Sequence, residues 1–270
     1  MEANFLSGTL GATGINVHRL GLSASYRPGE RTVRRALDEG VNYFFAYGFD
    51  THMIRVLREL FGDARETAVI ATGAYNYILW QQDLRQTLEK RLRQLRTDYI
   101  DVFHFLGVMK PKQMTPKVLD DLEALRHDPR VRAVSVSIHD RKFAGQLAAN
   151  NSLDCLMIRY NAAHRGAETD IFPHLEKHKT GLVSYTATRW TWLLRRVKGW
   201  PKDRPIPTAG QCYRFVLSNP RVDVCLTAPR SEKQLLENLA AARQGPLPED
   251  EMQFMREYGD AVHCAAGWFM

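Results

Sequence analysis

Eight short apolar segments of strand length recur along this chain, each separated from the next by a longer segment. Several of the eight are apolar at both odd and even positions, as expected for parallel strands that are covered on both faces. Eight alternations of strand and helix in about 250 residues favour a closed (β/α)8 TIM barrel of the α/β class over an open doubly wound sheet. The predicted strands start near His18, Val41, Ala68, Tyr99, Val131, Asp154, Gly181 and Val222.

Apolar residues in the intervening segments recur every three or four positions, which is the spacing of a helix with one buried face. Each such stripe could cover one pair of strands. The clearest stripes are Ile54, Leu57 and Leu60; Leu84, Leu88, Leu92 and Leu95; and Val118, Leu119, Leu122 and Leu125.

The two ends of the chain add to the predicted barrel. The stretch GTLGATG near Gly8 precedes the first strand, so we interpret it as a hairpin across the barrel floor and not as a dinucleotide-binding turn. Residues after Gly245 predict one more helix, starting near Pro248 with acidic residues in its first turn. We therefore expect a single barrel domain over residues 1–270, with an N-terminal hairpin and a C-terminal extra helix.

Composition narrows the functional classes. With 270 residues, 44% of them hydrophobic, the chain can bury a full core as one domain. Its 37 basic and 30 acidic residues suit an anionic ligand, an acidic partner or simple solubility, and no Lys/Arg block is long enough to predict nucleic-acid binding. The four cysteines are far apart, so neither a disulfide framework nor a metal site is expected. Without a signal-like N-terminus or about 18 consecutive apolar residues, we expect a soluble cytoplasmic protein with no membrane segment.

Six motifs occur in order at barrel spacing: GVNYFFAYG, DYIDVFHF, VRAVSVSIH, IRYN, VSYTATRW and LTAPRSEKQLLEN. Together they resemble the aldo-keto reductase family, including its bacterial and potassium-channel-β-like branches, along nearly the whole chain. The resemblance implies hydride transfer from NAD(P)H to a carbonyl, with the site at the carboxyl ends of the strands. The implied cofactor is NADP, with NAD possible.

The last motif predicts a loop followed by a helix, with Ser231 and Gln234 in capping-box spacing. A helix N-terminus is a natural seat for phosphate, and Arg230 could grip a 2′-phosphate. The resemblance places Glu237 and Asn238 on the adenine side of the cofactor. The alternative is a helix that is merely well capped.

At the nicotinamide end, the resemblance places Tyr185 where the family stacks an aromatic ring on the cofactor, and Ser137 at a carboxamide-binding position. The family's other two carboxamide anchors, an asparagine and a glutamine, correspond here to Ile138 and Met157. The residues that would have to compensate are Asn161 and His139.

A long basic connection follows the seventh predicted strand, from Thr188 to Thr208. Family members place a strap over the cofactor pyrophosphate here, so Arg189, Arg195, Arg196 and Lys198 could neutralise it. A solvated surface segment is the alternative.

The family's proton relay of aspartate, tyrosine, lysine and histidine is not retained in register. Its four positions hold Phe45, Asp50, Gly73 and Leu106. A relay without the lysine would leave a tyrosine neutral near pH 7, because nothing lowers its pKa from about 10.

Strand periodicity indicates how an acid could be rebuilt, since residues two apart point to the same side. Tyr47 shares a side with Phe45, and His104 with Leu106, so the two could form a relay, with His139 as a further candidate. A hydrogen-bonded core residue is the alternative for His104. For Asp50, a helix N-cap is favoured over a substrate contact.

We therefore expect an NAD(P)H-dependent oxidoreductase that uses Tyr47 as a non-standard proton donor. The alternative is a catalytically silent NAD(P)H-binding barrel that senses or scaffolds; a lyase or isomerase using Asp50 and His104 is less favoured. Aromatic residues predict a small apolar or planar substrate. They are Phe45, Tyr47, Tyr75, Tyr77, Trp80 and Trp192, with Trp268 and Phe269 able to close the pocket from the tail.

Overall fold

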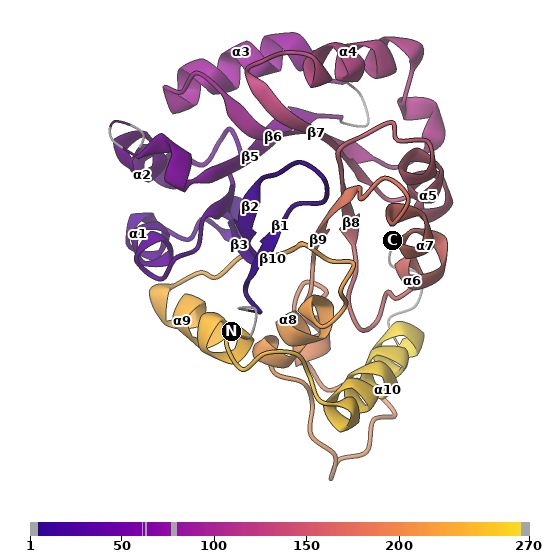
Figure 1. Ribbon diagram of the computed structural model, residues 1–270. Coiled ribbons are helices and arrows are strands. Elements are labelled where there is room, and N and C mark those ends of the chain that lie inside the picture. The colour runs from indigo at the N-terminus through magenta and orange to yellow at the C-terminus, as the bar shows by residue number, and fades with distance from the viewer. Residues whose placement is uncertain (1–4, 61, 63, 77–79, 266–270) are drawn as a thin grey trace.

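A closed barrel of eight parallel strands forms the centre of the computed structural model, which describes residues 5–60, 62, 64–76 and 80–265 (Figure 1). Around the barrel the strands run in the order β10-β3-β4-β5-β6-β7-β8-β9, so every neighbour in sequence is a neighbour in space and β10 closes on β3. All eight predicted strands are confirmed. They are β3 (Leu20–Ser23), β4 (Tyr43–Phe45), β5 (Val69–Tyr75), β6 (Ile100–Val108), β7 (Val131–Ile138), β8 (Cys155–Arg159), β9 (Gly181–Tyr185) and β10 (Val224–Thr227).

Helices cover the outside of the barrel (Figure 1). The stripes on α2 (Thr51–Leu60) and α3 (Leu84–Leu95) face the strands, although Leu60 is only half-buried. Leu119 on α4 (Pro116–Arg126) was wrongly assigned to the buried face. Leu119 lies about 100° around the helix from Val118, which leaves the buried stripe to Val118, Leu122 and Leu125. The α-helices are α1 (Glu30–Asp38), α2 (Thr51–Leu60), α3 (Leu84–Leu95), α4 (Pro116–Arg126), α5 (Arg141–Ala149), α6 (Ala167–Asp170), α7 (Phe172–Leu175), α8 (Ala209–Leu217), α9 (Glu232–Ala242) and α10 (Glu249–Ala265). Short 3-10 turns are η1 (Ala24–Tyr26), η2 (Arg65–Thr67), η3 (Pro111–Gln113) and η4 (Trp192–Leu194).

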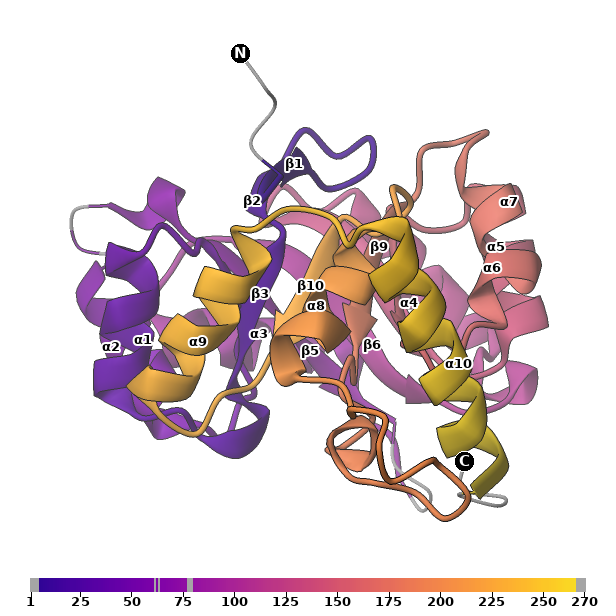
Figure 2. The same cartoon turned by 90° about the horizontal axis from the view of Figure 1, so that it is seen from below.

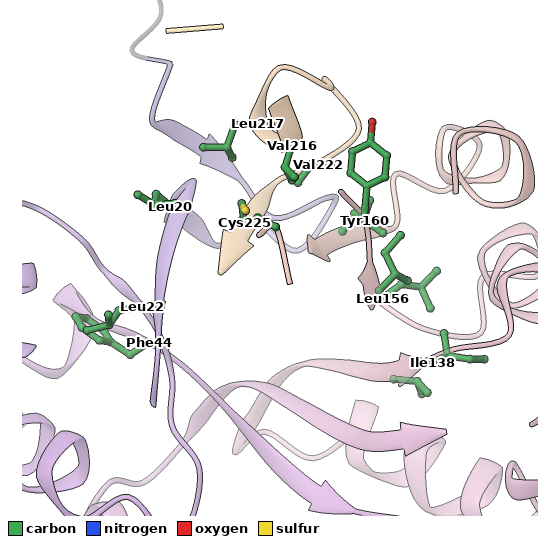
Figure 3. Close-up of a cluster of buried hydrophobic side chains, with 14 of the residues drawn as sticks. Leu20, Leu22, Phe44, Ile138, Leu156, Tyr160, Val216, Leu217, Val222 and Cys225 are labelled. Atoms are coloured by element: carbon green, nitrogen blue, oxygen red, sulfur yellow. The ribbon is translucent and has the colours of Figure 1, made fainter. Parts of the chain in front are cut away.

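Two apolar cores result from the alternation of side chains along each strand. On β4, Phe44 belongs to the core between strands and helices, whereas Tyr43 and Phe45 belong to the core inside the barrel. Figure 3 shows side chains of the outer core, among them Leu22, Phe44 and Leu156. Because both faces of the sheet are buried, the strands are apolar at both parities, as the sequence predicts.

The predicted hairpin at the barrel floor is confirmed by the antiparallel pairing of β1 (Ser7–Thr9) and β2 (Asn16–His18). Its turn is anchored to the barrel, because Asp223 Oδ2 accepts hydrogen bonds from Gly11 N at 3.1 Å and Leu182 N at 2.8 Å. Gly11 has a φ of +52°. Both that φ and the close approach to β9 require a residue without a side chain.

The long connection 188–208 lies at the end of the barrel opposite the hairpin, beside the carboxyl end of α10 (Figure 2). The extra helix α10 begins directly after Pro248 with three acidic residues, as predicted. Where the structure describes the chain, no helix combines the length and apolar character that crossing a bilayer requires. Over the same residues, no group of three or more histidine, cysteine, aspartate or glutamate side chains is arranged to hold a metal ion.

Candidate active site at the barrel mouth

Five polar or aromatic residues form the top layer of the barrel interior, at the carboxyl ends of its strands. Tyr47, Tyr75 and Tyr185 pack on the apolar core inside the barrel and are half-buried. His139 and Arg159, also half-buried, continue the inward-facing parity of β7 and β8. The mouth therefore has a tyrosine side on β4 and β5 and a basic side on β7 to β9.

Tyr47 ends a short chain of hydroxyl groups. Its phenolic oxygen accepts a hydrogen bond from Ser25 Oγ at 3.2 Å, and Ser25 Oγ lies 2.8 Å from Ser23 Oγ. Burial raises the pKa of Tyr47, and the two serines act in the opposite direction to a smaller extent. Tyr47 is therefore a protonated phenol at neutral pH, with its own hydrogen free to be donated elsewhere.

Aromatic stacking fixes the Tyr47 ring. Its centroid lies 5.9 Å from that of Tyr75 and 5.1 Å from that of Phe49, with both pairs stacked. Such pairs contribute about 0.5–1.5 kcal/mol beyond burial. The ring thus has a defined position at the mouth.

The structure does not form the relay of Tyr47 and His104 that strand parity suggested. His104 is 0% exposed and lies one layer deeper, and neither of its ring nitrogens has a hydrogen-bond partner within the described parts of the chain. Phe45 contacts both residues, with ring centroids 4.8 Å from Tyr47 and 5.4 Å from His104. Burial lowers the pKa of His104 to about 3, so it is a neutral core residue. Parity fixed the direction of the side chain correctly, but a step of two residues covers about 6.6 Å of depth.

Gly73, at the position of the family's lysine, cannot gain a side chain without a shift of the backbone. A Cβ built there would lie 1.9 Å from the carbonyl oxygen of His104 on the neighbouring strand. Asp50, at the position of the family's tyrosine, is the N-cap that the sequence favoured: its Oδ1 accepts from Met53 N at 2.8 Å. Neither Gly73 nor Asp50 therefore replaces the lysine or the tyrosine of the family's relay.

On the basic side, Arg159, His139 and Tyr185 form a hydrogen-bonded chain. Arg159 Nη2 lies 3.2 Å from His139 Nδ1, and His139 Nε2 lies 3.3 Å from the Tyr185 hydroxyl. A guanidinium only donates, so Nδ1 accepts and neutral His139 carries its proton on Nε2, facing Tyr185. Burial, and secondarily Arg159, lowers the pKa of His139 and keeps it neutral. The sequence reasoning missed Arg159, although it shares strand parity with Met157 on β8.

Asn161, expected to compensate for a missing carboxamide anchor, uses its amide in hydrogen bonds to the protein backbone. It is fully buried, its Nδ2 donates to Thr186 O at 2.9 Å, and its Oδ1 accepts from Ala163 N at 3.0 Å. It therefore joins β8 to the loop after β9. Burial raises the pKa of the Tyr185 phenol, while Arg159 and then a hydrogen bond with Ser137, which lies one layer deeper on β7, act in the opposite direction.

Arg189 also differs from the expected exposed phosphate contact. It is 3% exposed, and its Nη1 donates to Val262 O of α10 at 2.9 Å. It ties the long loop to the last helix. Nearby, burial together with Arg189 and Arg159 lowers the pKa of His164 to about 3, which marks this side of the mouth as electropositive.

The amino end of α9 opens at the same face. Ser231 Oγ accepts from Gln234 N at 3.3 Å, and Gln234 Oε1 accepts from Arg230 N at 2.9 Å. The Ser231 cap agrees with the prediction, while the glutamine reaches one residue further back than in a capping box. The Arg230 guanidinium lies over the Tyr26 ring, 4.9 Å from its centroid, and the Arg230 residue is exposed.

The two residues expected at the adenine side differ in exposure: the Glu237 side chain is exposed, whereas Asn238 is buried and hydrogen-bonded. The side chain of Glu237 is 61% exposed, and its nearest cation is Lys233 at 3.9 Å. Asn238 is buried and donates from Nδ2 to Thr227 Oγ1 at 3.0 Å, which attaches α9 to the end of β10.

Exposed large apolar side chains gather at this face. Of the seven in the described residues, only Leu119 lies elsewhere. The positions Tyr77, Trp268 and Phe269, expected in the pocket lining, fall outside the described residues. The exposed members of the rim are Tyr26, Phe49, Trp80, Met109, Trp190 and Trp192.

Comparisons with known proteins agree with this architecture. The model of the Aldo/keto reductase family matches residues 10–260. The chain is 20% identical to the uncharacterized oxidoreductase YqkF of Bacillus subtilis (strain 168), over 92% of this chain and 95% of that protein. It is 26% identical to the aldo-keto reductase YhdN of the same organism, over 64% of this chain and 59% of that protein.

Solved structures show the same fold. The aldo-keto reductase AKR11C1 from Bacillus halodurans (holo form) has a TM-score of 0.76 at 19% identity, covering 93% of this chain and 95% of that one. An aldo/keto reductase from Klebsiella pneumoniae in complex with NADP and acetate has a TM-score of 0.75 at 18% identity, with coverage of 93% and 95%. Since the family model spans most of the chain, this protein belongs to the aldo/keto reductase family of oxidoreductases.

Proposed function

We propose that this protein reduces a small carbonyl substrate with NADPH, or less readily NADH, and that Tyr47 supplies the proton. The observation that carries the proposal is the position of the protonated Tyr47 phenol at the barrel mouth, held by stacking and by the Ser25 hydroxyl. Membership of the family supports the cofactor class, and the similar aldo/keto reductase structure from Klebsiella pneumoniae is a complex with NADP and acetate.

The residues present fit a dinucleotide at two of three regions. Arg230 and the first turn of α9 suit the phosphates, with Ser231 and Gln234 ordering that turn and Glu237 and Asn238 on the adenine side. The Tyr185 ring suits the nicotinamide face, with Ser137 beneath it. The carboxamide region differs from the family, since Ile138 and Met157 are apolar and the Asn161 amide is engaged elsewhere. When bound, the cofactor supplies the hydride.

The protein's own groups handle the proton. As negative charge develops on the substrate oxygen, Tyr47 donates its hydroxyl proton to that oxygen. Ser25 keeps donating to the Tyr47 oxygen and so stabilises the charge left there, while Ser23 orients Ser25. Ser25 is exposed, so water can return the proton along the same chain. His139 contacts the Tyr185 hydroxyl, and Arg159 contacts His139; we assign both residues to positioning the Tyr185 ring and not to proton transfer.

The rim of exposed aromatic side chains favours an apolar or planar substrate. Pockets for small ligands are lined mainly by apolar and aromatic groups with a few polar anchors. Trp80 is 56% exposed and Trp192 41% exposed, so both present ring surface at the mouth. Aromatic aldehydes, ketones and quinones are the matching substrate classes.

A silent NAD(P)H-binding barrel remains the second candidate function, and one observation favours it. Burial raises the pKa of Tyr47 above its ordinary value and makes it a weak acid, and within the described residues no hydrogen bond from a charged side chain offsets this. Such a barrel would bind cofactor and act as a sensor or scaffold.

Binding and turnover separate these functions. Nicotinamide fluorescence during titration with NADPH and NADH measures binding, and a panel of aldehydes, ketones and quinones measures turnover. Turnover that is lost in Tyr47→Phe and kept in Tyr99→Phe, at the opposite end of the barrel, supports the reductase. Saturable binding with no turnover supports the sensor, and a lack of binding to either nucleotide contradicts both.

A further inference from the structure

We propose that Gln94, in the last turn of the outer helix α3, is a positioning residue for the proton donor Tyr47. The inference rests on the proposed function, because it takes Tyr47 as the acid of the reaction. It goes beyond that function by giving a side chain of the outer ring of helices (Figure 1) a role in the chemistry, through the carbonyl of Gly48.

Tyr47 is the first residue of a tight turn between β4 and α2. Just before the turn, Ala46 N donates to Ala71 O at 2.8 Å, which continues the pairing of β4 with β5. Asp50 N donates to Tyr47 O at 3.1 Å and closes the turn, and Asp50 Oδ1 caps α2. Both ends of the turn are therefore attached to regular structure, whereas its middle, Gly48 and Phe49, depends on other contacts.

Gln94 supplies a contact to the middle of the turn. Its Nε2 donates a hydrogen bond to the Gly48 carbonyl oxygen. Its Oε1 accepts a hydrogen bond from Arg91 Nη1 at 2.8 Å, one helical turn earlier on α3. A guanidinium only donates and a carbonyl oxygen only accepts, so this orientation of the Gln94 amide is the one in which both contacts are hydrogen bonds.

The turn also passes very close to Arg91. That residue is 4% exposed, and a Cβ built on Gly48 would lie 1.6 Å from Arg91 Nη1. The backbone can approach the buried guanidinium because residue 48 has no side chain. Gly48 and Gln94 together therefore fix the distance between the turn and α3.

A shift of the Gly48 carbonyl would reach the phenol directly. This carbonyl belongs to the peptide that joins Gly48 to Phe49, and Phe49 stacks on the Tyr47 ring with centroids 5.1 Å apart. Moving this peptide would displace Tyr47 from its 3.2 Å contact with Ser25 Oγ. A misplacement of about 1 Å can cost on the order of a hundredfold in rate, even when the substituted residue lies far from the chemistry. We therefore expect Gln94 to act on kcat and not on cofactor binding.

Three substitutions test this role. Gln94→Glu keeps the size of the side chain and an acceptor for Arg91, but it replaces the donor to Gly48 with a carboxylate oxygen that repels the carbonyl. Gln94→Leu removes both polar atoms and is the second variant, in case the carboxylate impairs folding. Gln86→Glu is the matched control, since it makes the same chemical change at an exposed position earlier on α3. Urea unfolding checks that each variant is folded.

We expect Gln94→Glu and Gln94→Leu to lower kcat about tenfold, while the Kd for NADPH stays within about twofold. In the Tyr47→Phe background neither should lower kcat further, because no phenolic proton remains to be positioned. The Tyr47 titration, followed by ultraviolet difference spectra, should move to higher pH as the contact with Ser25 weakens. Gln86→Glu should match the wild type in every measurement.

Two results would overturn the inference. An unchanged kcat in both Gln94 variants would show that the Gly48 contact does not position the acid. An equal fall in kcat with and without the Tyr47 hydroxyl, or an unmoved Tyr47 titration, would show that Gln94 has a structural role only. The proposed function fails separately, and the inference with it, if the wild type shows no turnover or if Tyr47→Phe alone is fully active.

Discussion

On the β3 to β5 side of the mouth, Tyr47 is surrounded by hydroxyl groups and aromatic rings, whereas on the β7 to β9 side Arg159 stands beside Tyr185. The first side holds a proton on a neutral donor. The second concentrates positive charge around the expected redox ring. Under the proposed function, proton donation would belong to the side that carries Tyr47 (the proton wall) and nicotinamide binding to the side that carries Tyr185 and Arg159 (the cofactor wall), where the positive charge gathers.

Under the proposed function, this division accounts for a site that works without the family's relay. The lysine and histidine of that relay would have stood on β5 and β6, where Gly73 now contacts the β6 backbone and Leu106 is buried. Those positions became part of the apolar interior. In the proposed function the acid is Tyr47, two residues beyond Phe45, where a hydroxyl chain reaches solvent through Ser25.

The strongest test of the proton wall is Tyr47→Phe. Loss of a positioned acid typically lowers the rate by 10² to 10⁴, so we expect kcat to fall by roughly that factor. The Kd for NADPH should stay within about twofold of the wild-type value, because the proposed cofactor contacts lie on the other wall. A substitution that removes a contact made only in the transition state lowers kcat and leaves ground-state binding unchanged. Steady-state kinetics and fluorescence titration measure the two quantities. A variant with full activity would show that Tyr47 is not the acid.

The variant Gly73→Ala tests whether β5 can accept a side chain at the position of the family's lysine. The new Cβ would lie 1.9 Å from His104 O, so β5 and β6 must separate. Overpacking of this kind typically costs about 1–3 kcal/mol, and contact with backbone places it at the upper end. Urea unfolding measures the change, with Gly8→Ala as control because its nearest neighbour is 3.4 Å away. Equal stability of the two variants would show that the strands separate freely.

At the amino end of α9, where the proposed phosphate contacts lie, Arg230→Gln should weaken binding of NADPH more than binding of NADH. Removing a charge-assisted contact to a 2′-phosphate costs about 1.5–3 kcal/mol, so Kd for NADPH should rise roughly tenfold to a hundredfold. Kd for NADH should change little, because NADH lacks that phosphate. Equal weakening of both would place Arg230 at the pyrophosphate, and no effect on either would remove it from the site.

The smallest expected effect concerns the hydroxyl chain. Ser25 lowers the pKa of Tyr47, so Ser25→Ala should move the Tyr47 titration to higher pH and make the phenol a weaker acid. Loss of one hydrogen bond of about 1 kcal/mol corresponds to a decrease in kcat of roughly fivefold. The Tyr47 titration is obtained by ultraviolet difference spectra against Tyr47→Phe, and Ser25→Thr is expected to restore the wild-type value. An unchanged titration would show that Ser25 does not act on the phenol.

Short sequence patterns were enough to predict most of the fold. The eight strands, the floor hairpin and the start of α10 were predicted because strand parity, glycine turns and helix-start signals depend on neighbours in sequence. The Ser231 and Asp50 caps were predicted for the same reason, since a cap contacts a backbone N–H only three residues away. The error at Leu119 arose because an apolar residue can sit at the edge of a helical stripe and still be exposed.

What the sequence determined by itself was the barrel of eight strands, through the alternation of strand and helix, and the inward or outward direction of side chains on a strand, through its period of two residues. The depth of each side chain within the barrel, and the residues that it contacts, were decided only by the tertiary structure. Phe45 separates Tyr47 from His104, Arg159 meets His139 across two strands, and Arg189 reaches α10 over 73 residues of sequence. These contacts join segments that are distant along the chain, and no local pattern specifies which of them will pack together.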